Sequence, residues 1–118
     1  MATAAEIFEL VDTQQVDALV ALYAVDAKFA LGNNGVATGR GMIAAGNKAF
    51  FTLVQGIRHE LLREWAVGNV TIAETDVTYT RRDGKEVKVP AVSIWEVDEA
   101  GLITDYRVFV DQGPVFAP

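Results

Sequence analysis

The spacing of apolar residues changes halfway along the chain. Before Ile57, apolar positions recur every three or four residues, as they do on one face of an amphipathic helix. After Ile57, β-branched and aromatic residues become frequent and turn-forming residues recur about every dozen positions, which is typical of an antiparallel sheet. The pattern therefore predicts an α+β protein with its helices first and its strands second.

Three helices are expected in the first half. The first begins at Thr3, because Thr3 and Glu6 have the spacing of a capping box, in which each side chain bonds the backbone of the other residue. The second is predicted over residues 16–23, followed by a short strand over residues 28–31. A third helix is predicted over residues 40–56, where the apolar stripe has helical spacing.

Turn residues divide the second half into four strands. Gly68-Asn69 and Asp83-Gly84 are both predicted to form two-residue hairpin turns, and residues 98–101 a longer one. The resulting strands cover residues 57–67, 70–82, 85–97 and 102–111. Pro90 lies inside the third of these and predicts a bulge or an unpaired stretch, because proline has no amide hydrogen to donate.

The two tight turns also predict which residues lie opposite one another. Counting back from them pairs Asp76 with Leu61 on one neighbouring strand and with Ala91 on the other. His59 then lies diagonal to Asp76 on the same sheet face. That face is apolar except for a small polar group, which comprises His59, Arg63, Glu74, Asp76, Thr78, Thr80, Ser93 and Tyr106.

Two carboxylates on one sheet face indicate more than packing against helices. A buried charge is costly unless it is paired, so a concavity filled by water or a ligand accounts for the two groups better than a dry core does. The alternative for Glu74 is a cross-strand ion pair with Arg63 near solvent.

Asp76 is the leading candidate for a catalytic acid or base. Apolar surroundings would disfavour its charged form and so suit it to proton transfer. The alternative is a structural carboxylate satisfied by Thr78 or His59. His59 is the one histidine of the chain, and it would orient Asp76 or share its proton, unless it is a partly exposed residue without a function.

The remaining candidates would bind a substrate. Hydroxyl and amide groups would hydrogen-bond to it, and aromatic or apolar side chains would contact its carbon skeleton; the residues concerned are Asn47, Thr78, Ser93, Trp95, Tyr106 and Val108. The alternative for the polar side chains is that their hydrogen bonds are made within the protein. The alternative for Trp95 is that it packs in the core.

Composition narrows the classes of partner. A chain of 118 residues is most simply one domain, here residues 1–118, and its net charge of -6 opposes nucleic acid and anionic membranes. The absence of cysteine and the single histidine exclude disulfides and multi-histidine metal sites. Apolar runs are too short for a membrane span, and the N-terminus lacks the order of a signal peptide. We therefore expect a cytoplasmic protein.

Three stretches of the chain resemble a known superfamily. Residues 18–27, 38–43 and 103–111 are similar to the second helix, the start of the third helix and the last strand of nuclear transport factor 2-like domains, in their SnoaL-like and ketosteroid isomerase-like branch. The resemblance implies a cone-shaped α+β domain in which three N-terminal helices pack on a curved antiparallel sheet and enclose a pocket. It also implies a homodimer, formed through the sheet face that carries the apolar residues Val77, Val92, Ile94 and Phe109.

The resemblance does not extend to two known sets of catalytic residues. Positions that match the ketosteroid isomerase base and oxyanion hole carry no suitable group, since Ile7 and Ser93 occupy two of them. Against limonene epoxide hydrolases, Asp76 matches an acidic aspartate, but Glu74 replaces the arginine and Val108 the second aspartate.

The resulting hypothesis is acid–base catalysis without a cofactor on a small apolar oxygenated substrate. The reaction would be an isomerisation, a cyclisation, a dehydration or a hydration such as epoxide opening. The alternative is a non-catalytic ligand-binding or dimerisation module of the same fold.

Overall fold

The first helix begins where its capping residues predict. The computed structural model describes residues 2–118, and its helix α1 covers Ala4–Asp12. The amide of Glu6 donates to Thr3 Oγ1 over 3.1 Å, and the Glu6 carboxylate accepts from the Thr3 amide, so both halves of the capping box are present. Ile7 and Phe8 are buried on the apolar side of this helix.

The second helix is shorter than predicted. Helix α2 covers only Val16–Val20, and strand β1 (Tyr23–Leu31) begins where the helix was expected to continue. The prediction was wrong here because a short apolar run fits a buried strand as well as a helix, and pairing of Tyr23 with Ile103 decides between them. Strand β2 (Val36–Thr38) pairs with β1 and was not predicted.

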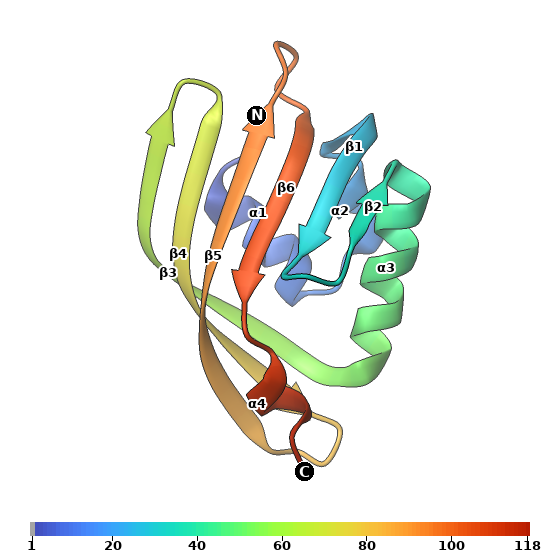
Figure 1. Ribbon diagram of the computed structural model, residues 1–118, viewed down its shortest axis with the longest axis vertical. Coiled ribbons are helices and arrows are strands. Elements are labelled where there is room, and N and C mark those ends of the chain that lie inside the picture. Colours follow the sequence, from blue (N-terminus) through green and yellow to red (C-terminus); the bar gives the residue numbers. More distant parts are fainter. Residues whose placement is uncertain (1) are drawn as a thin grey trace.

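Six strands form one curved sheet that carries the helices on one face (Figure 1). The remaining elements are α3 (Arg40–Leu53), β3 (Val54–Val67), β4 (Val70–Arg81), β5 (Glu86–Val97), β6 (Ile103–Val110) and α4 (Gly113–Phe116). The strand order is β2-β1-β6-β5-β4-β3. Strands β1 and β6 run parallel, so the sheet is mixed rather than wholly antiparallel as predicted.

The first hairpin confirms the predicted register near its turn. Val67 pairs with Val70, Trp65 with Ile72, and Arg63 with Glu74. An irregularity between Leu61 and Arg63 then shifts the pairing by one residue. As a result His59 pairs with Val77, not with Thr78 as predicted.

The second hairpin turn holds three residues where two were predicted. The Arg81 amide donates to the Lys85 carbonyl over 2.8 Å, which leaves Arg82, Asp83 and Gly84 in the loop. Gly84 has a φ of 88°, the left-handed conformation that ends a three-residue hairpin loop. The extra residue moves every pair between β4 and β5 by one position relative to the prediction.

This shift decides which side chains of β4 face the helices. We call the helix-covered side of the sheet its inner face and the other side its outer face. The buried residues of β4 are Ala73, Thr75, Val77 and Tyr79, while Glu74, Asp76 and Thr78 alternate with them on the outer face. On β5 the inner residues are Val89, Ala91, Ser93 and Trp95.

Pro90 does not interrupt the sheet. It pairs with Asp76 on the exposed outer face, and the register runs through it without a shift, so the predicted bulge is absent from this ladder. The alternative prediction, an unpaired stretch, is confirmed on the other side of β5, where pairing with β6 begins only at Ala91.

The short C-terminal helix α4 lies near the lower end of the molecule in Figure 1. Val115 of α4 is buried in a cluster with Val54, Val77 and Tyr79. Arg81 Nη1 donates to the carbonyl of Ala117 over 2.6 Å, which ties the end of the chain to β4. Among residues 2–118, no helix is long and apolar enough to cross a membrane.

Candidate functional site

A cavity of about 120 Å³ lies between the inner face of the sheet and the helices. Its wall is mostly apolar and comprises side chains of helices, strands and the C-terminal segment, among them the aromatic residues Phe8, Tyr23, Phe29, Phe50, Phe51, Tyr79 and Tyr106. Engineered apolar cavities of roughly 150 Å³ bind benzene, so a single ring is the size of ligand that suits this space.

His59 on β3 lines the cavity and contacts Asp12, which lies behind it at the end of α1. His59 Nδ1 lies 2.5 Å from Asp12 Oδ1, and the His59 amide donates to Asp12 Oδ2 over 2.9 Å. Both carboxylate oxygens are therefore engaged by one residue. Because a carboxylate only accepts, Nδ1 carries the proton and Nε2 of the neutral ring has the free lone pair.

Packing against aromatic side chains also holds the His59 ring. The ring stacks on Phe8 with centroids 4.6 Å apart and planes within 6°. Phe8 in turn meets Trp95 edge-on at 6.3 Å. The His59 side chain is 12% exposed and lines the cavity, so it is fixed in orientation and open to a bound ligand.

A second polar group of the wall is formed by Tyr106 and Ser93. Burial raises the pKa of Tyr106 to about 12, and a hydrogen bond with the Ser93 hydroxyl acts in the opposite direction. Burial and the neighbouring Tyr106 also raise the pKa of Tyr23 well above its ordinary value. Both phenols are therefore neutral at physiological pH.

Tyr79 and Gln112 form a third polar group. Gln112 Nε2 donates to the Tyr79 hydroxyl over 3.0 Å, and both residues line the cavity. Burial raises the pKa of Tyr79, with the Gln112 hydrogen bond lowering it in part, so this phenol also keeps its proton. The Tyr79 ring is held edge-on by Phe50 at 5.9 Å.

Five of the predicted site residues line the cavity, namely His59, Asn47, Ser93, Tyr106 and Val108. Asn47 uses its Nδ2 to donate to the carbonyl of Ile43 over 2.9 Å, which leaves its second N–H and its carbonyl oxygen to meet a ligand. Trp95 is not part of the wall. It is buried in the core and stacks on Tyr106 at 5.3 Å.

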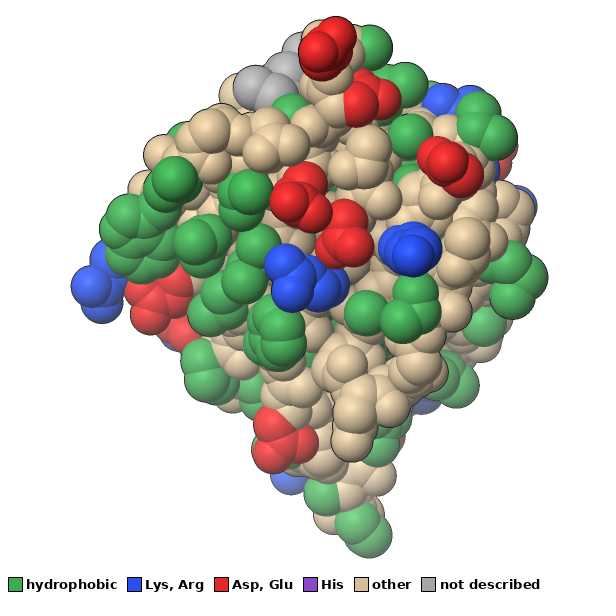
Figure 2. Space-filling model, turned by 45° about the horizontal axis from the view of Figure 1, so that its top comes forward, with side chains coloured by type: hydrophobic (Ala, Val, Ile, Leu, Met, Phe, Trp, Pro, Cys, Tyr) green, Lys and Arg blue, Asp and Glu red, His purple; other side chains and the backbone are tan. Residues whose placement is uncertain are grey.

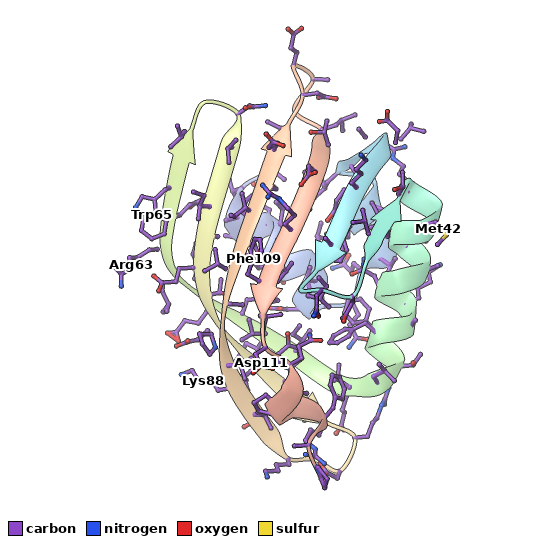
Figure 3. All side chains as sticks on the ribbon, in the orientation of Figure 1. Met42, Arg63, Trp65, Lys88, Phe109 and Asp111 are labelled. Carbon is purple, nitrogen blue, oxygen red and sulfur yellow. The ribbon has the colours of Figure 1, made fainter. Side chains whose placement is uncertain are left out.

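The predicted neighbourhood of Asp76 is wrong. Asp76 lies on the outer face, where its carboxylate is 3.7 Å from the ammonium of Lys88 (Figure 3 labels Lys88). Thr78 is on the same outer face, between Arg58 and Lys88. His59 faces the cavity on the other side of the sheet, so Asp76 and His59 do not meet. The physical cause is the one-residue change in both hairpin registers.

The ion-pair alternative for Glu74 is confirmed. Arg63 Nε lies 2.9 Å from Glu74 Oε1 on the outer face, at positions directly opposite in the ladder. This pair accounts for one of the two carboxylates that had suggested a polar concavity.

Sequence reasoning missed Asp12, Tyr79 and Gln112. Asp12 lies 47 positions from His59, and nothing in local spacing links a helix terminus to a strand so far along the chain. Tyr79 was assigned to the wrong face by the two-residue turn, and a three-residue turn would have placed it inside. Within residues 2–118, no group of three or more histidine or acidic side chains is arranged to hold a metal ion.

The fold is that of a known family of domains. The family model for the SnoaL-like domain matches residues 4–106, so the chain belongs to the SnoaL-like domain family. The resemblance seen in the sequence is thereby confirmed, as is the cone-like α+β fold. No curated protein matches this sequence.

Solved structures of the same fold share little sequence with the chain. A hypothetical protein with a ketosteroid isomerase-like fold from Catenulispora acidiphila DSM 44928, in complex with trimethylamine, is 16% identical with a TM-score of 0.85, covering 98% of this chain and 92% of that one. A putative SnoaL-like polyketide cyclase from Jannaschia sp. CCS1 is 16% identical with a TM-score of 0.83, covering 97% and 89%. The epoxide hydrolase/cyclase-like enzyme SalBIII, of pyran ring formation in salinomycin, is 23% identical with a TM-score of 0.80, covering 91% and 86%. At these identities the likeness establishes the fold.

Proposed function

We propose that this protein is a cofactor-independent acid–base enzyme in which His59 moves a proton and Asp12 orients it. The observation that carries the proposal is the His59–Asp12 contact at the wall of the cavity. Asp76, the candidate favoured by the sequence, has no part in it, because it lies across the sheet from the cavity.

The chemistry of the pair follows from its hydrogen bonds. Asp12 fixes the tautomer that leaves Nε2 unprotonated, and it stabilises the imidazolium that forms when Nε2 accepts a proton. When the ring is neutral, it can accept a proton at Nε2 and return it later, which is the role of a general base and acid. Other polar groups of the wall, from Tyr106, Ser93 and Asn47, would bind substrate oxygens, and Val108 would contact its apolar part.

The wall indicates the class of substrate. Apart from His59, the lining residues carry no ionisable group that is charged at neutral pH, so a charged ligand would lose its hydration without an opposite charge to pair with. A small neutral oxygenated molecule fits better. Two proteins of similar fold, a putative polyketide cyclase and an epoxide hydrolase/cyclase-like enzyme, support isomerisation, cyclisation, dehydration or epoxide opening as the reaction.

Exchange of α-protons of cyclohexanone in D₂O tests the proposal without knowledge of the natural substrate. The base takes a proton from the carbon beside the carbonyl, the enolate forms, and a deuteron is returned, which proton NMR follows as loss of the α-proton signal. We expect the wild-type protein to accelerate exchange over buffer. His59→Gln should remove about 10²- to 10⁴-fold of that acceleration, the usual contribution of a general base.

Two aspartate variants complete the test. Asp12→Asn should slow the exchange less than His59→Gln does, because the ring remains but its tautomer is no longer fixed. Asp76→Asn is the matched control, since it removes a carboxylate charge from the outer face, and it should leave the rate unchanged. If the wild-type rate equals that of buffer, or if His59→Gln exchanges as fast as wild type, the catalytic proposal fails and the ligand-binding module becomes the better description.

We also propose that residues 1–118 act as one cytoplasmic SnoaL-like domain that assembles as a homodimer through the outer face. Support comes from large hydrophobic side chains on that face, with Trp65 46% and Phe109 52% exposed. Figure 2 shows hydrophobic side chains gathered on the side of β3 and β4, next to charged groups. A hydrophobic centre with a charged rim is the usual composition of a protein interface.

The acidic net charge supports small molecules over nucleic acid as the ligand.

A further inference from the structure

Tyr79 is the polar side chain of the wall that the sheet register brings toward His59. His59 pairs with Val77 and Tyr79 pairs with Ile57, so His59 and Tyr79 are diagonal neighbours on the inner face of adjacent strands. Diagonal positions of this kind have Cβ atoms roughly 7–8 Å apart, a span that a six-membered ring can bridge. Tyr106 lies on β6, and strands β4 and β5 separate it from His59.

The direction of the Gln112 hydrogen bond leaves the Tyr79 proton free. Gln112 Nε2 donates to the phenolic oxygen, so that oxygen acts as the acceptor and its own O–H is left available as a donor. Within residues 2–118, no protein group accepts that proton. The side chain is nevertheless buried, at 4% exposed, and both it and Gln112 line the cavity. A buried hydroxyl with an unused donor, aimed by a neighbouring amide, has the properties of a ligand-binding group.

The position of Gln112 is fixed by the end of the chain. It immediately precedes α4, whose Val115 is buried, and the following Ala117 is tied to Arg81. The ring of Tyr79 is restrained in turn by Phe50. Donor and positioning residue are therefore both held in place before any ligand enters, which lowers the entropic cost of binding.

We propose that Tyr79, positioned by Gln112, donates a hydrogen bond to an acceptor oxygen of the ligand while His59 faces the ligand's acidic C–H or O–H group. The inference rests on the cavity being the ligand site, as in the proposed function, and it names the substrate class more narrowly. The ligand is a neutral molecule of about one ring that carries a carbonyl, ether or epoxide oxygen, a size consistent with cavities that bind benzene. Tyr79 remains a donor across the physiological pH range because burial raises its pKa.

Binding of carbonyl-labelled cyclohexanone tests this directly. Its dissociation constant is measured by NMR titration and its carbonyl stretch by infrared difference spectroscopy, and neither readout needs turnover. We expect the bound carbonyl of wild type to absorb at a lower frequency than that of Tyr79→Phe. Tyr79→Phe should also weaken binding about threefold to tenfold, as expected for one neutral hydrogen bond. Thr75→Val is the matched control, because it removes a buried hydroxyl from the same strand that does not line the cavity, and it should change neither quantity.

Gln112→Leu tests the positioning role. It should raise the carbonyl frequency part of the way toward that of Tyr79→Phe, and it should have no further effect when combined with Tyr79→Phe, since the two residues act through one hydrogen bond. The proposal is overturned if wild type does not bind cyclohexanone, if Tyr79→Phe leaves both readouts unchanged, or if Tyr106→Phe rather than Tyr79→Phe shifts the carbonyl frequency. Failure of proton exchange with an intact Tyr79-dependent carbonyl shift would remove the His59 proposal alone.

Discussion

The burial of Tyr106 links the wall of the cavity to the stability of the fold. Its ring stacks between Phe29 at 5.7 Å and Trp95 at 5.3 Å, so ionisation would place a charge in the centre of an aromatic layer. The folded protein therefore holds this proton up to a pKa of about 12, whereas the unfolded chain releases it near 10. Between these two pH values the folded state binds more protons than the unfolded state.

The sign of the resulting pH dependence is fixed by that difference. The stabilising contribution of Tyr106 is complete below pH 10 and is lost as the pH rises toward 12, so wild type should lose more stability on alkalinisation than Tyr106→Phe. The difference between the two proteins should change by about 2 kcal/mol between pH 9 and 11.5. Urea unfolding of both proteins at the two pH values measures it. Equal alkaline losses would show that Tyr106 ionises as easily in the folded state as in the unfolded one.

Individual site residues were predictable from the sequence only where the register was simple. Ser93, Tyr106 and Val108 were predicted to contact the ligand, and they line the cavity: Ser93 pairs with Val108, and Tyr106 lies two residues before Val108, so all three share one face of the sheet. Asp76 was assigned to the inner face and lies outside, because a single extra residue in a turn reverses every side chain of a strand. His59 keeps its predicted face, but its partner Asp12 depends on a tertiary contact that no local pattern encodes.

At the scale of elements, the end of α1 sets the position of Asp12. Gln14, two residues after the last residue of the helix, has a φ of 57°. The Gln15 amide donates to the carbonyl of Leu10 over 2.9 Å, which is the bond pattern of a Schellman motif. Glycine is the residue normally found at this left-handed position, because a side chain there costs energy. The chain therefore stores strain two residues after its proposed orienting carboxylate.

Replacement of that residue tests the strain. Gln14→Gly should stabilise the protein by about 0.5–1 kcal/mol, seen as a higher midpoint of urea unfolding with an unchanged slope. Gln15→Gly is the matched control: Gln15 has a φ of -88°, where glycine brings no relief, adds freedom to the unfolded chain and removes the hydrogen bond from Gln15 Nε2 to Thr13 Oγ1, so it should lower stability. A loss of stability in both variants would mean that the Gln14 side chain stabilises the folded state by more than the backbone strain destabilises it.

The elements themselves were predicted to within a few residues wherever a cap or turn marked them. The capping box located α1, and the turn at Gly68 located the β3–β4 hairpin together with its first pairs. The helix predicted over residues 16–23 was partly wrong, because the parallel partner strand β6 comes from the far end of the sequence. Such long-range pairing overrides a weak local preference for helix.

At the scale of the whole molecule, the fold was predictable because three short stretches, spread along the chain, all resemble the same superfamily. The residues of the face proposed for dimerisation were harder to predict. Val77 was assigned to the face that pairs with a second copy, yet it is buried at 1% exposure beneath the helices. The other three predicted residues, Val92, Ile94 and Phe109, do lie on the outer face. Trp65 on β3 joins them there, and Figure 3 shows Trp65 and Phe109 from that side.

A pair of glutamate substitutions tests whether this face joins two copies of the chain. Wild type should show about twice the chain mass of 12.8 kDa in size-exclusion chromatography with light scattering. Phe109→Glu should raise the dimer dissociation constant about 30-fold or more, because an unpaired charge would replace a large side chain at the centre of the interface. Met42→Glu is the matched control: Met42 is 62% exposed on α3 and points away from the sheet (Figure 3), so its substitution should leave the mass unchanged. Two results would contradict dimerisation through the outer face. Wild type could be monomeric, or the Phe109→Glu protein could dimerise as tightly as wild type.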